Sequence, residues 1–201
     1  MRKALAESPT KEKLFDAARD LMMAKGFVGT AVDEVCEQAG VSEGSFFHYF
    51  KSKEDLGAQL LERYTSARAK IVEEKINSCG SDDPLDRIDA YLNCVLDLAK
   101  ETDPKGCLVG TFSQEISETH PELRELCARI FNSKGHLFCH ELEKAKIKYP
   151  PKISFESREM WDYFLSLMQG TMILVKVRQD KSVIPRNIEC FRQYLKSLFG
   201  K

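Results

Sequence analysis

Two short apolar patterns of helical spacing, separated by one glycine, constrain the fold of this chain most strongly. The first pattern places apolar residues at i, i+3, i+4 and i+7, and these are Val32, Val35, Cys36 and Ala39. Gly40 follows, and glycine readily takes the positive φ that a sharp reversal of the chain requires. Phe46 and Phe50 then stand four residues apart. The pattern predicts helix, tight turn, helix over residues 31–50.

Hydroxyl residues stand where these two helices are expected to begin. Thr30 precedes the first helix and Ser42 the second, and such side chains accept hydrogen bonds from the first free N–H groups of a helix. Helix, tight turn, helix is the layout of the DNA-binding helix-turn-helix, whose second helix lies in the major groove. Periodicity alone equally allows a purely structural pair of helices.

Helical periodicity continues through the rest of the chain, and no segment alternates as a strand would. Helices are expected from Pro9, from Ser52 and from Pro84, with later ones beginning near residues 107, 121, 157 and 185, and the helix from 121 is expected to continue past Phe138. The sequence therefore predicts an all-α fold of about nine helices. A three-helix domain at 1–53 is joined by a long helix to a helical domain at 54–201.

Composition limits the class of protein. Of the 201 residues 43% are hydrophobic, which is sufficient for a folded core, and no run approaches the ~18 apolar residues of a membrane helix. The N-terminus lacks the apolar stretch of a signal peptide, so we expect a cytoplasmic protein. The seven cysteines lack paired metal-binding spacings and are expected to be free thiols. We expect no cofactor.

The charge balance does not favour a nucleic-acid partner. The formal net charge is −1, and acidic residues outnumber basic ones eight to six within residues 1–50, whereas a DNA-binding domain usually carries a basic surface. Four lysines could still line one face of such a domain, and these are Lys11, Lys13, Lys51 and Lys53.

Residues 10–65 resemble the tetracycline-repressor (TetR) family in the order of their motifs. These motifs are Ala17-Ala18, Gly26-Phe27, Ala39-Gly40-Val41-Ser42, Gly44-Ser45, Tyr49-Phe50 and Ser52-Lys53-Glu54. The resemblance implies a ligand-responsive transcription regulator, a repressor that binds a double-stranded DNA operator as a homodimer. It also implies a dimer seam built from the last two helices, and the apolar residues on more than one side of the segment 157–180 agree with that.

The family motif assigns DNA-contacting roles to matching positions. Contacts to the DNA backbone are implied for Thr30, Tyr49 and Lys53, and base readout for Ser42, Glu43, Ser45 and His48. Phe47 stands where the family usually has tyrosine, which leaves an apolar contact with a sugar or a thymine methyl group. Replacing Lys53 by alanine is predicted to weaken binding to all sequences alike and to lower the salt slope by about 0.9.

The second domain is expected to bind a small apolar or electrophilic effector. Aromatic and methionine side chains could line its pocket, although such residues are more often plain core, and they are Phe112, Phe131, Phe138, Trp161, Phe164, Met168 and Met172. Gly106-Cys107-Leu108 is similar to the same stretch in the N-ethylmaleimide-reductase repressor (NemR) subgroup, which implies that Cys107 senses electrophiles and oxidants. Cys107 is expected in the first turn of a helix, where the dipole favours a thiolate, and a facing Lys176 would favour it further.

The sequence allows three other interpretations. His136 and His140 are spaced for one helix face and could hold a metal ion, but exposed histidine pairs are usually solvated, so we expect no metal site. A DNA-binding protein without an effector also fits the sequence. A thiol- or metal-dependent enzyme fits poorly, because the chain has no HExxH motif, no phosphate-binding loop and no convincing Ser–His–Asp set.

Overall fold

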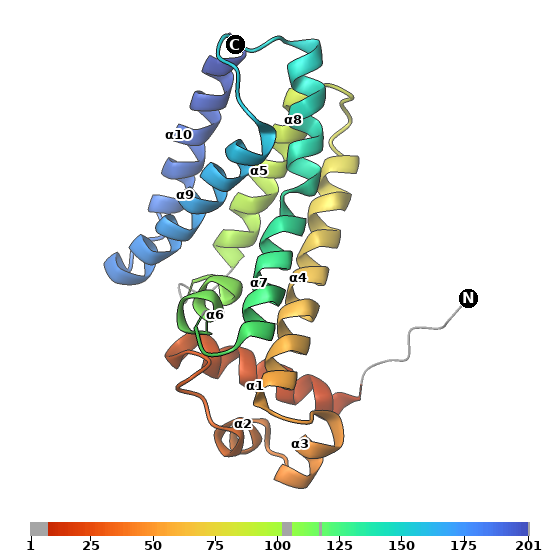
Figure 1. Cartoon of the computed structure of the whole chain (residues 1–201), viewed down its shortest axis with the longest axis vertical. Coiled ribbons are helices and arrows are strands. Elements are labelled where there is room, and N and C mark those ends of the chain that lie inside the picture. The colour runs from red at the N-terminus through yellow and green to blue at the C-terminus, as the bar shows by residue number, and fades with distance from the viewer. Residues whose placement is uncertain (1–7, 102–105, 117, 201) are drawn as a thin grey trace, which may run out of the picture. The chain divides into compact units, whose positions relative to one another are not determined.

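The computed structural model describes residues 8–101, 106–116 and 118–200 of the chain. Within these ranges every regular element is a helix, which confirms the all-α prediction (Figure 1). The helices are α1 (Pro9–Lys25), α2 (Val32–Ala39), α3 (Glu43–Tyr49), α4 (Lys53–Asn77), α5 (Pro84–Glu101), α6 (Leu108–Ile116), α7 (Pro121–Lys134), α8 (His136–Lys148), α9 (Ser157–Arg178) and α10 (Val183–Leu198). No described helix is both long and apolar enough to cross a membrane.

Contacts divide the chain into two compact units, and each unit is built from two separate stretches of the sequence. The first unit contains Met1–Tyr64 and Cys107–Ala128, and the second contains Thr65–Gly106 and Arg129–Lys201. Helices α4 and α7 each contribute residues to both. Helix α6 therefore belongs with the helix-turn-helix, although some sixty residues separate them in the sequence. The predicted functional division at residue 53 stays a prediction.

The first unit has a core of aromatic and aliphatic side chains. Phe15 of α1 and Phe50, which follows α3, meet edge to face with ring centroids 5.3 Å apart. Phe46 of α3 packs against Phe50 at 5.5 Å and is fully buried. Helices α1, α2 and α3 pack on one another, and α6 packs on α1. Of the apolar residues predicted for α2 and α3, all but the partly buried Val32 therefore lie in the core.

The second unit is built around an aromatic cluster. Phe138 of α8 stacks on Phe164 of α9 at 5.7 Å, and Phe164 lies 4.7 Å from Phe191 of α10. Arg87 of α5 donates to the Glu141 carboxylate of α8 at 3.0 Å and to the carbonyl of Ile76, near the end of α4, at 3.3 Å. Figure 1 shows α5 and α8 running side by side, as their packing requires.

One helix predicted from residue 121 through Phe138 is in fact two. Helix α7 ends at Lys134 and α8 begins at His136, with Gly135 between them. A side chain at Gly135 would lie within 2.5–2.7 Å of the Trp161 ring, so glycine lets the indole approach the backbone here. The Trp161 Nε1–H donates to the carbonyl of Phe131 at 3.1 Å. The packing of the indole thus accompanies the break that the apolar periodicity did not predict.

Candidate nucleic-acid interface

Helix α2 begins differently from the sequence-based expectation. Ala31, not Thr30, is the residue before its first turn, and the Glu34 carboxylate accepts the Ala31 N–H at 2.8 Å. The hydrogen bond from Lys25, followed by that from Ala31, lowers the pKa of Glu34. The Thr30 side chain is buried, and its hydroxyl donates to the carbonyl of Gly26 at 2.7 Å. The prediction that Thr30 caps α2 is therefore wrong.

The turn between α2 and α3 has the predicted geometry. Gly40 adopts φ +66° and ψ 40°, the left-handed conformation that ends a helix, and its N–H lies against the carbonyls of Cys36 and Glu37. Ser42 then starts α3, because its hydroxyl accepts the Ser45 N–H at 3.2 Å. Both the glycine turn and the serine cap are confirmed.

Helix α3 exposes one row of side chains and buries the opposite one. Ser42, Glu43 and His48 are exposed, and Phe47 leaves 56% of its surface in solvent. Phe46 and Phe50 anchor the other side in the core. A hydroxyl, a carboxylate, an imidazole and an aromatic ring therefore project from one short helix. These groups can donate to and accept from base edges and can contact a thymine methyl group.

The remaining predicted DNA-contacting side chains are less accessible. Ser45 is half-buried and lies 3.1 Å from the Ser42 hydroxyl, and Tyr49 is half-buried with its hydroxyl 2.8 Å from that of Ser8. The Lys53 ammonium donates to the carbonyls of Phe27 and Thr30 at 3.1 and 3.0 Å. It also lies 4.6 Å from the centre of the Phe27 ring. Lys53 therefore already stabilises the α1–α2 turn.

The positive charges of this unit are partly engaged. Lys25 pairs with Glu34, and Arg19 pairs with Asp16 and Asp20. Lys11 is half-buried, with its ammonium within 5.4–5.6 Å of the Phe15 and Phe50 rings. Of the four lysines expected to line a DNA-facing surface, Lys13 and Lys51 are the exposed ones. Two of these four lysines therefore lie where they can attract a phosphate group.

The residues predicted to bind an effector fall in both units. Cys107 and Phe112 belong to the first unit, and the others, from Phe131 to Lys176, belong to the second. Phe112 is fully buried against Phe27, with ring centroids 5.0 Å apart. Trp161, Phe164 and Met168 are core residues of the second unit, Phe131 and Met172 are partly buried, and Lys176 is exposed. Cys107 is half-buried and directly precedes α6, so it stands just before the first turn, not within it.

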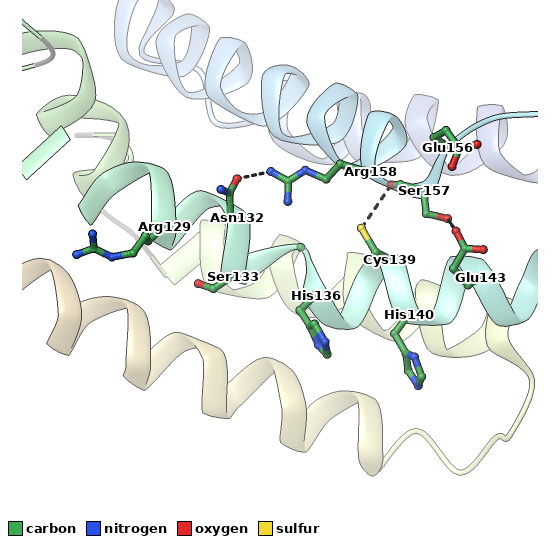
Figure 2. Close-up of a pocket in the computed structure, with 11 residues that line it drawn as sticks. Arg129, Asn132, Ser133, His136, Cys139, His140, Glu143, Glu156, Ser157 and Arg158 are labelled. Atoms are coloured by element: carbon green, nitrogen blue, oxygen red, sulfur yellow. Dashed lines mark hydrogen bonds between the residues drawn. The ribbon is translucent and has the colours of Figure 1, made fainter. Parts of the chain in front are cut away.

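A surface pocket of about 710 Å³ opens in the second unit, between the α7–α8 junction and the start of α9. It is lined by Arg129, Asn132, Ser133, Gly135, His136, Cys139, His140, Glu143, Glu156, Ser157 and Arg158, none of which was predicted to bind an effector. Figure 2 shows His136 and His140 pointing to the same side of α8, whereas Cys139 points to the other side, where its thiol donates to the Ser157 carbonyl at 3.4 Å. Burial raises the pKa of the Cys139 thiol. Nowhere among the described residues do three or more potential metal ligands gather.

Two family models match the chain. The one described as bacterial regulatory proteins of the tetR family covers residues 14–60, which include α2 and α3. The one described as the tetracyclin repressor-like C-terminal domain covers residues 84–191.

Relatives and solved structures agree with the family models. The HTH-type transcriptional repressor NemR of Escherichia coli (strain K12) is 34% identical over 175 residues, which are 87% of each chain. The HTH-type transcriptional repressor DhaR of Mycobacterium sp. (strain GP1) is 25% identical over 177 residues, 88% of this chain and 87% of that protein. The crystal structure of reduced E. coli NemR matches with a TM-score of 0.75 and 26% identity, covering 92% of this chain and 96% of the other. The regulatory protein TetR from Rhodobacter sphaeroides matches in fold, with a TM-score of 0.81, 22% identity, and 93% and 99% coverage.

Proposed function

Because this chain belongs to the tetR family of bacterial regulatory proteins, we propose that it is a repressor released from a palindromic operator by a small effector. The observation that carries the proposal is the exposed row on α3. Ser42, Glu43, Phe47 and His48 project from a helix that Phe46 and Phe50 hold against the core. Such a row suits the major groove. The matching family models and relatives are transcription regulators and not enzymes.

The proposed operator has two half-sites. One seven-residue helix reaches few bases, and two copies related by a two-fold axis read a palindrome with half-sites one helical turn apart. Exposed apolar side chains on α9 and α10 support a second copy as the partner, and these are Tyr163, Ile173, Val177 and Tyr194. We propose that residues 1–53 bind the DNA and that residues 54–201 bind the effector and the second subunit.

The proposed interface is tested by selecting operator DNA with the purified protein. The protein should enrich a palindrome, and Ser42→Ala, Glu43→Ala and His48→Ala should each relax the preference at particular base pairs. Each good base contact contributes roughly 1–3 kcal/mol of discrimination, about a fivefold to hundredfold preference. Glu37→Ala on α2, which removes an exposed carboxylate outside the proposed reading row, is the matched control. Enrichment of no sequence would contradict the proposal.

We propose Cys107 as the position where an electrophile is sensed. A crystal structure of the reduced form of the NemR relative is among the similar structures, and Cys107 of this chain is half-buried, directly before α6. Its thiolate sulfur would add to the electron-poor carbon of a maleimide or enone. The S–C bond forms, the C=C π bond breaks, and the neighbouring carbon takes a proton.

The sensing proposal is tested with N-ethylmaleimide and operator DNA. Treatment should release the wild-type protein, whereas Cys107→Ser should stay bound. Cys190→Ser, which removes an exposed thiol, should release as the wild type does. Release of Cys107→Ser at the wild-type dose would contradict the proposal. Thermal shifts against a panel of apolar compounds separate this protein from an effector-independent DNA-binding protein, which would shift with none.

A further inference from the structure

The turn between α1 and α2 holds a carboxylate from α6. Gly26 ends α1 with φ +87°, a conformation that favours glycine, and it is buried. The Val28 N–H donates to Glu115 Oε2 at 2.9 Å. A Cβ at Gly26 would lie 2.6 Å from the Glu115 carboxyl carbon, so this carboxylate occupies the space that a side chain would need. Residue 26 must therefore be glycine for two independent reasons.

The carbonyls of the same turn are held by a residue from another helix. Lys53 is the first residue of α4, and its ammonium donates to the carbonyls of Phe27 and Thr30. Glu115 thus accepts a hydrogen bond from an N–H of the turn, and Lys53 donates hydrogen bonds to carbonyls of the same turn. Hydrogen bonds to charged groups are stronger than those between neutral groups. Two side chains distant in sequence therefore fix the conformation of residues 26–30.

Apolar contacts support the position of Glu115. Phe112 stands three residues before it on α6, on the same helix face, and its ring packs on Phe27 within the turn. Gly57 of α4 makes room for both rings, because a Cβ there would lie 3.0 Å from each. Helix α6 is therefore docked against the turn by a packed aromatic pair as well as by a hydrogen bond.

We propose that Glu115 is a positioning residue for DNA recognition. It touches no DNA, but it fixes the turn from which α2 starts at Val32, and α2 in turn packs on α3. This inference rests on the proposed function, because it takes α3 as the helix that reads the operator. The loss of Glu115 would leave α3 folded but free to vary in its orientation.

The same geometry connects Cys107 to the turn. The Cys107 carbonyl accepts the Thr111 N–H at 2.8 Å, so the residue is attached to the first turn of α6, and Glu115 is the next-to-last residue of that helix. A nine-residue helix moves as a rigid rod of about 13 Å. A displacement that begins at Cys107 therefore reaches the α1–α2 turn through Glu115.

The test uses three substitutions at Glu115 that separate charge from reach. Glu115→Asp keeps the charge but is one methylene shorter, Glu115→Gln loses the charge but keeps an oxygen for the Val28 N–H, and Glu115→Ala loses both. Operator affinity is measured by fluorescence anisotropy over a series of salt concentrations. We expect Asp and Ala to weaken binding roughly tenfold, the scale of one hydrogen bond to a charged group, and Gln to weaken it by a smaller factor, because a weaker neutral hydrogen bond to the Val28 N–H remains. Glu118→Ala, which removes an exposed carboxylate two residues beyond α6, should bind as the wild type does.

The salt slope distinguishes positioning from direct contact. Because a positioning residue makes no phosphate contact of its own, the slope of log K against log salt should be the same in all variants. Hydrogen exchange should be faster at the Val28 amide in Glu115→Asp than in Glu115→Gln, at unchanged exchange in the core of α3. Wild-type affinity in Glu115→Asp would overturn the inference, and so would an equal loss in Glu115→Gln. If the wild-type protein selects no DNA, the proposed function fails instead.

Discussion

At the scale of single residues, Phe47 is the most informative side chain on α3. It is an exposed aromatic ring in the row that faces the proposed groove, and it carries no hydrogen-bonding group. A thymine methyl group is the base feature that an apolar side chain recognises there. Operators in which deoxyuridine replaces thymine should bind the wild-type protein several-fold more weakly. Phe47→Ala should bind both operators equally, and a wild-type-like discrimination in that variant would remove Phe47 from the interface.

Lys53 illustrates how a contact to the protein itself modifies a sequence-based prediction. Its ammonium is within hydrogen-bond distance of carbonyls of the α1–α2 turn, so Lys53→Ala should lower the free energy of unfolding by about 1–2 kcal/mol. Thermal denaturation measures this loss, and Lys51→Ala, which removes an exposed lysine, is the matched control. The predicted drop of about 0.9 in the salt slope remains the separate sign of a phosphate contact. An unchanged melting temperature would contradict the stabilising role.

Asp83 should make the stability of the protein depend on acidity. Burial raises its pKa, but hydrogen bonds from Lys148, Tyr149 and the Leu85 N–H outweigh that effect and hold the pKa at about 2, below the usual value of 3.8 for an aspartate. A carboxylate with a lowered pKa stabilises the folded state above its unfolded value, and this stabilisation is lost as pH falls from about 4 to 2. Melting temperatures over this range should fall less steeply for Asp83→Asn than for the wild type. Asp82→Asn, at an exposed neighbour, should follow the wild type.

At the scale of helices, Gly135 shows a helix break that depends on packing and not on backbone conformation. Its φ is −81°, which any residue adopts, and only the Trp161 ring excludes a side chain. Gly135→Ala would gain about 1 kcal/mol of helix propensity, but we expect a net loss of roughly 1–3 kcal/mol because the indole must move. Denaturant unfolding checks this, with Ser133→Ala in α7 as the control. If Gly135→Ala is more stable than the wild type, the Trp161 ring moves aside at little cost in free energy.

The helix-turn-helix could be predicted because its determinants are local. The Gly40 turn, the Ser42 cap and the Phe46–Phe50 anchor all lie within eleven residues, and each was confirmed. The Gly135 break and the Glu115 contact depend on residues distant in sequence. Val28 and Glu115 are 87 positions apart, and no periodicity relates them. The Gly26-Phe27 pair is one of the family motifs that the sequence shows. The sequence does not indicate, however, which side chain fills the space beside that glycine.

At the scale of the whole molecule, the proposed function depends on two copies of α3 acting together. Ile173 and Val177 lie one turn apart on α9 and leave 50% and 77% of their surfaces exposed. Tyr163 of α9 also meets Tyr194 of α10 at 5.7 Å, so the exposed apolar face includes both helices. Apolar patches of this kind mark interfaces, and a second copy of the chain is the partner that a palindromic operator requires.

Replacing Ile173 and Val177 by glutamate should therefore produce a monomer, because burying two carboxylates in an apolar seam is costly. Sedimentation should give half the wild-type mass. Affinity for the full operator should fall by at least about a hundredfold, toward that for one half-site, because the second binding event is no longer intramolecular. Ile147→Glu, at an exposed apolar residue of α8, should remain a dimer with wild-type affinity. A double variant that stays dimeric would place the seam elsewhere, and a monomeric wild-type protein would remove the two-half-site operator from the proposal.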